Sequence, residues 1–222
     1  FNTTGKIIIG ENGVGIYGDG SAFVLNSGLI SDFGNSSVGI HLDTDTTGAA
    51  ILNDDSGVIN LGTDGIGIYT KGTGITTITN NGIIKTGASS DEGQSVGIYN
   101  ETAGVSIINT GILETGTSSV GIYNNAGTIT QNGQIKTGSK GIGIYSNQSN
   151  VNLNSDSILK VEDDNGIGVY AVNASNVVND GFMAIDDRSY GYVLRSDSNL
   201  INNGESTLRD NGGTSYGSMT SA

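Results

Sequence analysis

The segment SVGIYNETAGVSIINTGILETGTSSVGIY, residues 95–123, begins and ends with the same five letters, and it decides the fold. The first motif, Ser-Val-Gly-Ile-Tyr, stands at Ser95–Tyr99 and again at Ser119–Tyr123. Between the two copies lie an apolar run, Val105–Ile108, and a second motif, Asn109–Gly116 (NTGILETG). Each unit therefore carries three short segments of strand length, separated by Gly, Asn, Ser and Thr, which are typical of turns.

The first motif recurs along the whole chain as a pattern of apolar residue, Gly, apolar residue and Tyr. Its clear copies are Val14–Tyr17, Val38–His41, Ile66–Tyr69, Val96–Tyr99, Val120–Tyr123, Ile142–Tyr145 and Ile167–Tyr170. Two degenerate copies follow at Tyr190–Val193 and Tyr216–Met219. The central glycines are 22 to 30 residues apart, about 25 on average. A repeat of this length is the signature of a solenoid.

Strands as short as these cannot bury an apolar face alone. Stacking successive coils pairs each strand with its copies above and below, at a spacing of roughly 4.8 Å. The sequence therefore predicts an all-β fold: a parallel β-helix, or β-solenoid, of about nine coils with three short strands in each. We expect residues 1–222 to form a single solenoid segment, cut within repeats at both ends and thus a fragment of a longer protein.

Composition narrows the possible partners. The chain has 37 Gly but no Pro, Cys or Trp, and its net charge at pH 7 is −13. Without cysteine it forms no disulfide and offers no thiolate to a metal or a substrate. The negative charge would repel a phosphate backbone, so we expect no nucleic-acid partner. No apolar run is long enough, at about 18 residues, to predict a membrane-spanning helix.

The first motif also predicts which side chains face outward. Its two apolar residues are two positions apart and share one face of a strand, which we expect to point inward. Gly and Tyr would then share the outer face, with open surface beside each ring. The aligned rings would form a stripe of ligand-contact candidates: Tyr17, His41, Tyr69, Tyr99, Tyr123, Tyr145 and Tyr170. Two interpretations stay open, since the rings could fix the register of the coils or form a platform for sugar rings or a partner protein.

The repeat is lengthened at two places, which predicts two protruding loops. From His41 to the next second-motif glycine, Gly57, the distance is 16 residues instead of the usual 10 to 13, which places an insertion in Leu42–Ala50. A second insertion falls around Ala88–Gln94. Insertions in solenoids form surface loops, and these two carry the acidic residues Asp43, Asp45, Asp91 and Glu92. Either they take part in recognition, as loops on rigid scaffolds often do, or they are turns without a specific role.

The repeat also predicts two further rows of aligned side chains, one of carboxylates and one of asparagine amides. Asp163 and Asp164 occupy the same places in their coil as Asp186 and Asp187 do in the next. Stacking would bring these four carboxylates together, and either Ca²⁺ or Arg188 could neutralise them; a solvated acidic turn is the simpler interpretation. Asparagines at the start of the second motif should stack as a ladder of side-chain amides: Asn26, Asn80, Asn109, Asn154, Asn179 and Asn202.

Little in the sequence supports catalysis. His41 is the single histidine, and it occupies a position that holds Tyr in six other coils. No Ser-His-Asp set, phosphate-binding loop or metal-spaced histidine pair occurs. We therefore expect no enzyme, no catalytic residue and no cofactor apart from the calcium considered above. A β-helical enzyme acting on polysaccharides is a less favoured alternative, because it would need a cleft with convergent carboxylates and a basic residue.

The two copies of SVGIY at Ser95–Tyr99 and Ser119–Tyr123, with NTGILETG at Asn109–Gly116 between them, resemble the repeat of large fusobacterial autotransporter adhesins, which belong to the type V secretion class. The resemblance extends over essentially the whole chain, although some copies of the motifs match the pattern less closely. The last two coils depart from the pattern, and no binding residue of the family transfers, because the repeat itself is scaffold.

This resemblance implies a passenger β-helix that is exported and held at the bacterial cell surface by a C-terminal outer-membrane barrel outside these 222 residues. Passengers of this kind cross the membrane largely unfolded, which is consistent with the absence of cysteine. Family members attach bacteria to host cells and to other bacteria, some of them through galactose-type sugars or immune receptors. The expected function is therefore non-enzymatic adhesion to a host-cell glycan or receptor or to a partner bacterium, and the alternative is a structural spacer in the stalk.

Overall fold

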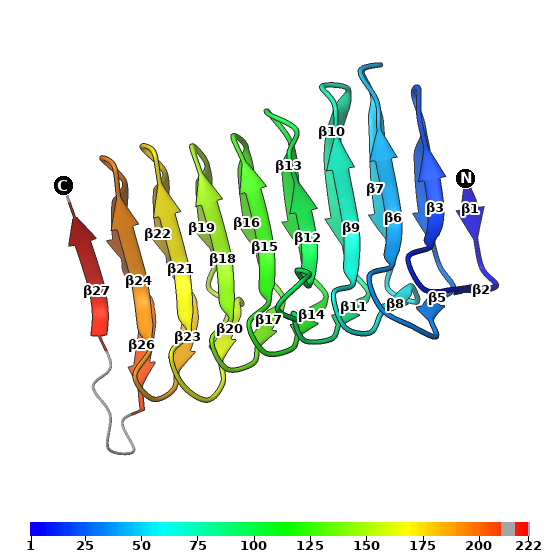
Figure 1. Cartoon of the computed structure of the whole chain (residues 1–222). Helices are drawn as coiled ribbons and strands as arrows, with labels where there is room; N and C mark the ends of the chain where they lie inside the picture. Colours follow the sequence, from blue (N-terminus) through cyan, green and yellow to red (C-terminus); the bar gives the residue numbers. More distant parts are fainter. Residues whose placement is uncertain (210–215, 222) are drawn as a thin grey trace.

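The computed structural model describes residues 1–209 and 216–221, the second range by its backbone alone, and it is a parallel β-solenoid. The strands form three parallel sheets, each of nine strands, and consecutive strands of the chain belong to different sheets. Each coil contributes one strand to each sheet, as Figure 1 shows for coils that follow one another along the axis. The predicted all-β class, the solenoid architecture and the three strands per coil are confirmed. Within the described ranges, no helix is long and apolar enough to span a membrane.

Sheet A is built from the apolar runs that precede the second motif. Its strands are β1 (Asn2–Thr3), β4 (Phe23–Asn26), β7 (Ala49–Asn53), β10 (Ile75–Asn80), β13 (Ser106–Asn109), β16 (Thr128–Gln131), β19 (Asn150–Leu153), β22 (Asn176–Asn179) and β25 (Asn199–Asn202).

Sheet B is built from the second motif. Its strands are β2 (Lys6–Ile9), β5 (Leu29–Asp32), β8 (Val58–Asn60), β11 (Ile83–Thr86), β14 (Ile112–Thr115), β17 (Gln134–Thr137), β20 (Ile158–Val161), β23 (Phe182–Ile185) and β26 (Glu205–Leu208).

Sheet C is built from the first motif. Its strands are β3 (Val14–Gly18), β6 (Val38–Asp43), β9 (Ile66–Lys71), β12 (Val96–Asn100), β15 (Val120–Asn125), β18 (Ile142–Asn147), β21 (Ile167–Val172), β24 (Tyr190–Arg195) and β27 (Tyr216–Ser221).

The core is a set of aliphatic rows that run along the axis. In one coil, Ile68 from sheet C, Ile78 from sheet A and Ile84 from sheet B are each 0% exposed. The neighbouring coils repeat the arrangement, and the buried side chains form one continuous cluster. Burying an isoleucine of this kind contributes about 1.5–3 kcal/mol. The interior is therefore held together coil by coil rather than around one centre.

The orientation predicted for the first motif is wrong at its glycine, and the inward position predicted for its first residue holds only in some coils, such as those of Val96 and Val120. As predicted, Ile68 faces inward and Tyr69 faces outward. Gly67, however, faces the core, because a Cβ atom there would lie 2.5 Å from the Cγ2 of Ile84. The strand pairing also skips this glycine, so Gly67 and Ile68 are both buried.

Two consequences follow for sheet C. The first residue of the motif lies at the edge of the interior and ranges from 1% exposed at Val96 to 44% at Val14. The glycines leave no open surface beside the tyrosine rings, because they belong to the inner face. Their role is to let the backbone of one coil approach the core side chains and the carbonyl of the next coil.

The predicted amide ladder is present and is buried at the end of sheet A. Asn26, Asn53, Asn80 and Asn109 are joined in sequence by side-chain hydrogen bonds of 2.7 Å, and Asn109 continues to Gln131 at 2.9 Å. Asn179 and Asn202 form a further pair at 2.7 Å.

The prediction for Asn154 is wrong. Leu153 pairs with Gln131 and so takes the buried place in the row. Asn154 lies one residue later and donates a hydrogen bond to Asn132 at 2.6 Å. The Nε2 of Gln131 is left buried without a hydrogen-bond partner in the described residues.

Candidate functional site

The predicted aromatic stripe is present as a row of stacked rings on the outer face of sheet C. We call it the aromatic ladder, and its members are Tyr17, His41, Tyr69, Tyr99, Tyr123, Tyr145 and Tyr170. Neighbouring ring centroids are separated by 4.5 Å at the closest pair and by 5.4 Å at the widest. This spacing follows from strand pairing, because Tyr99, Tyr123 and Tyr145 are direct partners in adjacent coils.

The rings of the ladder cover one another. Tyr123 and Tyr145 are stacked with an angle of 8° between their planes, and Tyr145 and Tyr170 with an angle of 10°. Tyr145, stacked on both sides, therefore turns its faces toward its neighbours and leaves mainly its edge and hydroxyl for a partner. The stacking is less complete toward the other end of the ladder, where the planes of Tyr69 and Tyr99 are tilted by 44°. Tyr17, at the end of the ladder, is 60% exposed, whereas the other six side chains are half-buried.

The ladder ends at Tyr170. Its partner in the next coil is Val193, and the guanidinium carbon of Arg195 lies 6.0 Å from the centre of the Tyr170 ring. Tyr192, one of the two tyrosines of that coil, stands one position before the ladder: it pairs with Val169, faces the core and is 2% exposed. Burial raises the pKa of Tyr192 above its ordinary value. The side chain of Tyr216, in the last degenerate copy, lies outside the described residues.

Glu101 joins two rungs of the ladder. Its carboxylate accepts hydrogen bonds from the hydroxyls of Tyr69, at 2.9 Å, and Tyr99, at 3.0 Å. Burial, with the hydrogen bond and charge of Glu101, raises the pKa of Tyr69 to about 12 and that of Tyr99 still further. We did not predict this contact from the sequence, although an acidic residue two positions after a ladder tyrosine was a usable signal.

The ring of His41 takes the place of a tyrosine ring in the aromatic ladder. Its ring stacks on Tyr69, with centroids 4.5 Å apart, and meets Tyr17 edge to face at 5.3 Å. Burial lowers the pKa of His41 below its ordinary value, although the charge of Asp43 acts in the opposite direction. The imidazole is thus held mainly neutral, which suits a ring stacked between aromatic neighbours.

The first predicted loop is shorter than the inserted segment. Asp43 belongs to strand β6 and pairs with Lys71 of the next coil. Asp45 is exposed and accepts two hydrogen bonds of 3.0 Å, from the backbone N–H and the hydroxyl of Thr73. The next coil therefore fastens this loop in place.

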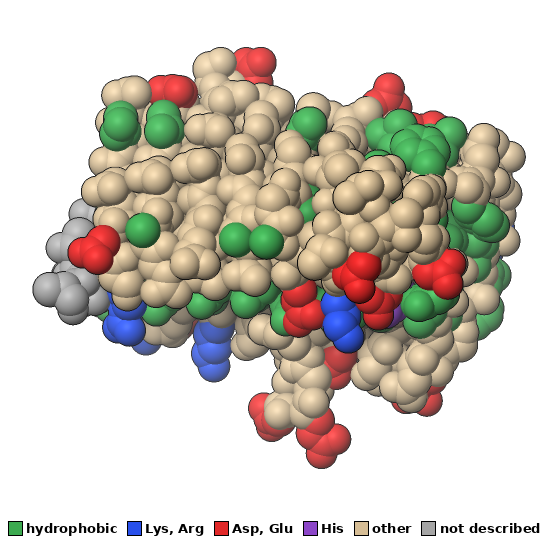
Figure 2. Space-filling view, turned by 90° about the horizontal axis from the view of Figure 1, so that it is seen from above, with side chains coloured by type: hydrophobic (Ala, Val, Ile, Leu, Met, Phe, Trp, Pro, Cys, Tyr) green, Lys and Arg blue, Asp and Glu red, His purple; other side chains and the backbone are tan. Residues whose placement is uncertain are grey.

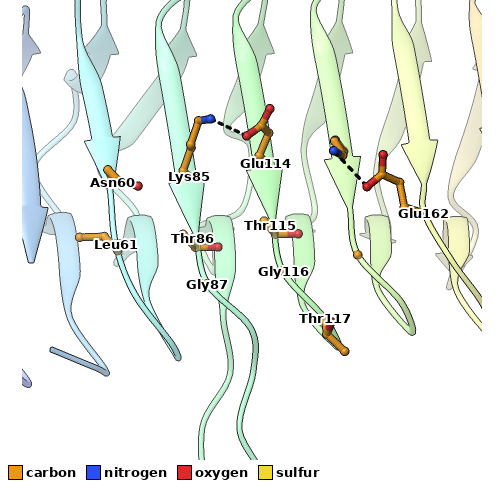
Figure 3. A pocket seen from close by; sticks show the side chains of 12 residues that line it. Asn60, Leu61, Lys85, Thr86, Gly87, Glu114, Thr115, Gly116, Thr117 and Glu162 are labelled. Carbon is orange, nitrogen blue, oxygen red and sulfur yellow. Dashed lines mark ion pairs between the residues drawn. The ribbon is translucent and has the colours of Figure 1, made fainter.

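The second predicted loop stands further from the body. In Figure 3 the chain beyond Gly87 runs past the turns of the neighbouring coils. Ser90 fastens the base of the loop, because its backbone N–H and hydroxyl donate to the carboxylate of Asp64 at 2.7 and 2.6 Å. Asp91 and Glu92 at its tip are exposed, and Figure 2 shows acidic side chains on the segment that projects furthest from the molecule.

The acidic pairs align as predicted at one of their two positions. Asp164 and Asp187 occupy equivalent places, because the backbone N–H of Lys140 donates to the carbonyl of Asp164 and that of Asn165 donates to the carbonyl of Asp187.

The alignment of Asp163 with Asp186 is wrong. The pairing of Val161 with Ile185 puts Glu162, rather than Asp163, beside Asp186. Asp163 is an additional residue in its turn, with a φ of 60°. Asp164 pairs with Arg188 and accepts a hydrogen bond of 3.0 Å from Ser139, which lowers the pKa of its carboxyl.

The structure thus favours Arg188, our alternative to calcium, as the neutralising group. In the part of the chain that the structure describes, no group of three or more His, Cys, Asp or Glu residues is placed to hold a metal ion. Asp187 has an interaction of its own and is not free. The calcium prediction has no support in this geometry.

The outer face of sheet B carries a feature that we did not predict. A hollow of about 440 Å³ lies over strands β11, β14 and β17, floored by threonine and glycine residues such as Thr86 and Gly116. Its rim carries the ion pairs Lys85–Glu114, at 2.7 Å, and Lys136–Glu162, at 3.0 Å (Figure 3). The alternation of Lys and Glu becomes visible in the sequence only when the sheet B strands are aligned.

Comparison with known proteins found no match for this chain. No protein-family model matches the chain, and no curated protein and no solved structure matches it.

Proposed function

We propose that this chain is a segment of an exported, surface-exposed adhesin that attaches a bacterium to host cells or to other bacteria, and that it has no enzymatic activity. The observation that carries the proposal is the aromatic ladder, which runs along the outer face of a stacked, regular scaffold. Aromatic side chains on a surface are frequent anchors of binding. The resemblance of the repeat to autotransporter passengers supports export to the outer membrane as the setting.

The ladder would bind through edges and hydroxyls rather than through free ring faces. Tyr17 is the member best placed to receive a sugar ring on its face, because it is 60% exposed. The internal rungs offer hydroxyls about one coil apart, which suits a partner with repeated hydrogen-bonding groups. A receptor protein or a linear glycan would meet this description.

The second candidate function is a structural spacer within the stalk of the same adhesin. The stacking of the rings on one another favours the spacer, because stacked side chains can fix the register of the coils without binding any partner. In that case the segment would extend a binding tip without contacting a partner.

A binding experiment on the isolated 222-residue chain separates the candidates. We expect the purified protein to bind host cells or a glycan array, and the variant Tyr99→Ala/Tyr123→Ala to bind at least about fivefold more weakly. The matched control is Ile108→Ala/Thr130→Ala, which removes two half-buried outward side chains from sheet A. Equal binding by both variants would reject the ladder as the contact surface, and an absence of binding by the unaltered protein would favour the spacer.

A further inference from the structure

The outer row of sheet B contains an unfavourable pair of like charges. Strand pairing places Lys85 beside Glu114, Glu114 beside Lys136, and Lys136 beside Lys160. Opposite charges in adjacent strands stabilise a sheet, whereas like charges directly opposite each other destabilise it. The pairing of Lys136 with Lys160 therefore costs stability without an evident structural benefit.

Only one of these two lysines has an acidic partner. Lys136 is paired with Glu162 at 3.0 Å, and this contact raises the pKa of Lys136. Among the described residues, no ion pair includes Lys160, although its side chain is half-buried. Lys160 is thus a cation fixed beside another cation and open to an anionic group from outside.

Lys160 also lines a hollow that adjoins the larger one. Asp186 and Arg209 also line this smaller hollow of about 110 Å³, and Glu162 lines both this hollow and the larger one. The two together follow the axis from the coil of Asn60 to the coil of Arg209. Six steps of roughly 4.8 Å make the two hollows together about 29 Å long, which suits a linear chain rather than a compact ligand. We refer to the two hollows together as the groove.

The charges of this groove differ from those of the molecule as a whole. Its cations are Lys85, Lys136, Lys160 and Arg209, and its anions are Glu114, Glu162 and Asp186. Among the described residues that line the groove, one positive charge is therefore in excess, on a protein whose net charge is −13. A polyanion would be repelled by the molecule around the groove, whereas a mainly neutral chain with one anionic group would not.

We propose that the groove on the outer face of sheet B binds a linear, mainly neutral oligosaccharide that carries a carboxylate, with the carboxylate on Lys160. The Lys–Glu pairs would bind the neutral sugars, because each pair presents a donor and an acceptor about 3 Å apart to adjacent hydroxyls. This inference names a ligand class and a second surface for the attachment proposed above, and it rests on that function only for its biological setting.

The test uses the whole 222-residue chain and a linear tetrasaccharide with a single glucuronate unit. Its methyl ester, which has the same size but no charge, is the comparison ligand. We expect the acid to bind about tenfold more tightly than the ester, and Lys160→Gln to remove that preference. Lys160→Arg, which keeps the charge, should retain it.

The control variant is Lys140→Gln. Lys140 is exposed in a turn outside both hollows, and its substitution changes the net charge by the same amount. We expect it to change the affinity less than about twofold. A second readout needs no variant: in NMR titrations of the unaltered protein, the perturbed amides should lie on β11, β14, β17 and β20.

Four results would overturn the inference: no binding of either ligand, equal binding of acid and ester, equal losses from Lys160→Gln and Lys140→Gln, or perturbed amides outside sheet B. Failure of the proposed function looks different. If the acid binds to the groove but the protein attaches to no cell, the groove stands and adhesion fails. If the protein attaches to cells through the ladder but ignores the tetrasaccharide, adhesion stands and the groove fails.

Discussion

Ile122 and Tyr123 are neighbours on strand β15, and they belong to regions that obey different constraints. Ile122 is fully buried in a row whose partners in adjacent coils, Ile98 and Ile144, are also isoleucines. Tyr123 belongs to the outer ladder, which accepts His41 in one coil and gives way to Val193 in another. The interior allows little choice because each residue is enclosed by the coils on both sides, whereas the outer face only needs a side chain that stacks. Side chains on the outer face can therefore change without loss of the fold.

The largest loss of stability is expected when a side chain is added to a core-facing glycine of the first motif. At Gly121 a Cβ atom would lie 2.4 Å from the carbonyl oxygen of Gly143 and 2.9 Å from the Cγ2 of Ile135. We expect Gly121→Val to lower the free energy of unfolding by about 4 kcal/mol, measured by chemical denaturation. Gly10→Ala is the control, because a Cβ there meets nothing within 4 Å. An equally small effect at both positions would contradict the placement of the motif glycine against the core.

The next effect tests the buried amide ladder. Asn80→Leu removes the hydrogen bonds to Asn53 and Asn109, each 2.7 Å long. The buried Oδ1 of Asn109 then loses its donor, whereas the Nδ2 of Asn53 keeps its weaker hydrogen bond of 3.2 Å to the carbonyl of Gly57. We expect a loss of about 2–3 kcal/mol in thermal or chemical unfolding. Asn81→Ala, one residue later, removes only a hydrogen bond from Thr110 on the surface and should cost less than about 1 kcal/mol. Similar losses of stability for the two variants would mean that the buried amide ladder contributes no more to stability than a surface hydrogen bond.

A smaller effect is expected on the outer face. Tyr123→Ala removes two ring contacts, at 4.6 and 4.9 Å, and should cost about 1–2 kcal/mol. Tyr123→Phe keeps the ring and should unfold at nearly the same denaturant concentration as the unaltered protein. If Tyr123→Ala destabilises as strongly as Gly121→Val, the two faces do not differ in the way described.

The smallest effect concerns proton binding at the ladder. The pKa of Tyr69 is raised from 10.0 to about 12, so the folded state keeps its proton while the unfolded state loses it. Stability that Tyr69 provides at neutral pH is therefore lost as the pH rises from 10.0 toward about 12. Glu101→Gln removes the negative charge, so tyrosinate absorbance should appear at lower pH and the alkaline loss of stability should be smaller. An unchanged titration would contradict the bridge between Glu101 and the two hydroxyls.

The sequence predicted the architecture because every coil repeats the same three short strands, each of which must bury its apolar side chains by stacking on its neighbours. The spacing of the motif fixes which residues stack, and so the aromatic ladder and most of the amide ladder were predictable. The inward position of Gly67 was not, because alternation assumes a regular pleat and the strand pairing skips this residue. Leu153 in place of Asn154 reflects a shift of one residue that only the three-dimensional register reveals.

The candidate surfaces were predictable to a lesser degree. Stacking predicts which residues approach one another, but it does not predict that ring faces cover each other or that Glu101 reaches two hydroxyls. The groove on sheet B depends on residues as far apart in the chain as Asn60 and Arg209. Its alternating charges become a pattern only after the strands are aligned.

The central claim is that the coils stack in register, so that each outer row runs along the axis with one residue per coil. Thr79, Ile108, Thr130, Asn152, Val178 and Ile201 form such a row on sheet A. Because the chain has no cysteine, spin labels can be placed on introduced cysteines at Thr79 and one other member of the row. The backbone separation should be roughly 19 Å for Val178 and 24 Å for Ile201, an increase of about 4.8 Å for the one added coil. Label distances that do not increase with the number of coils between the two sites would contradict the stacking on which the ladder and the groove both depend.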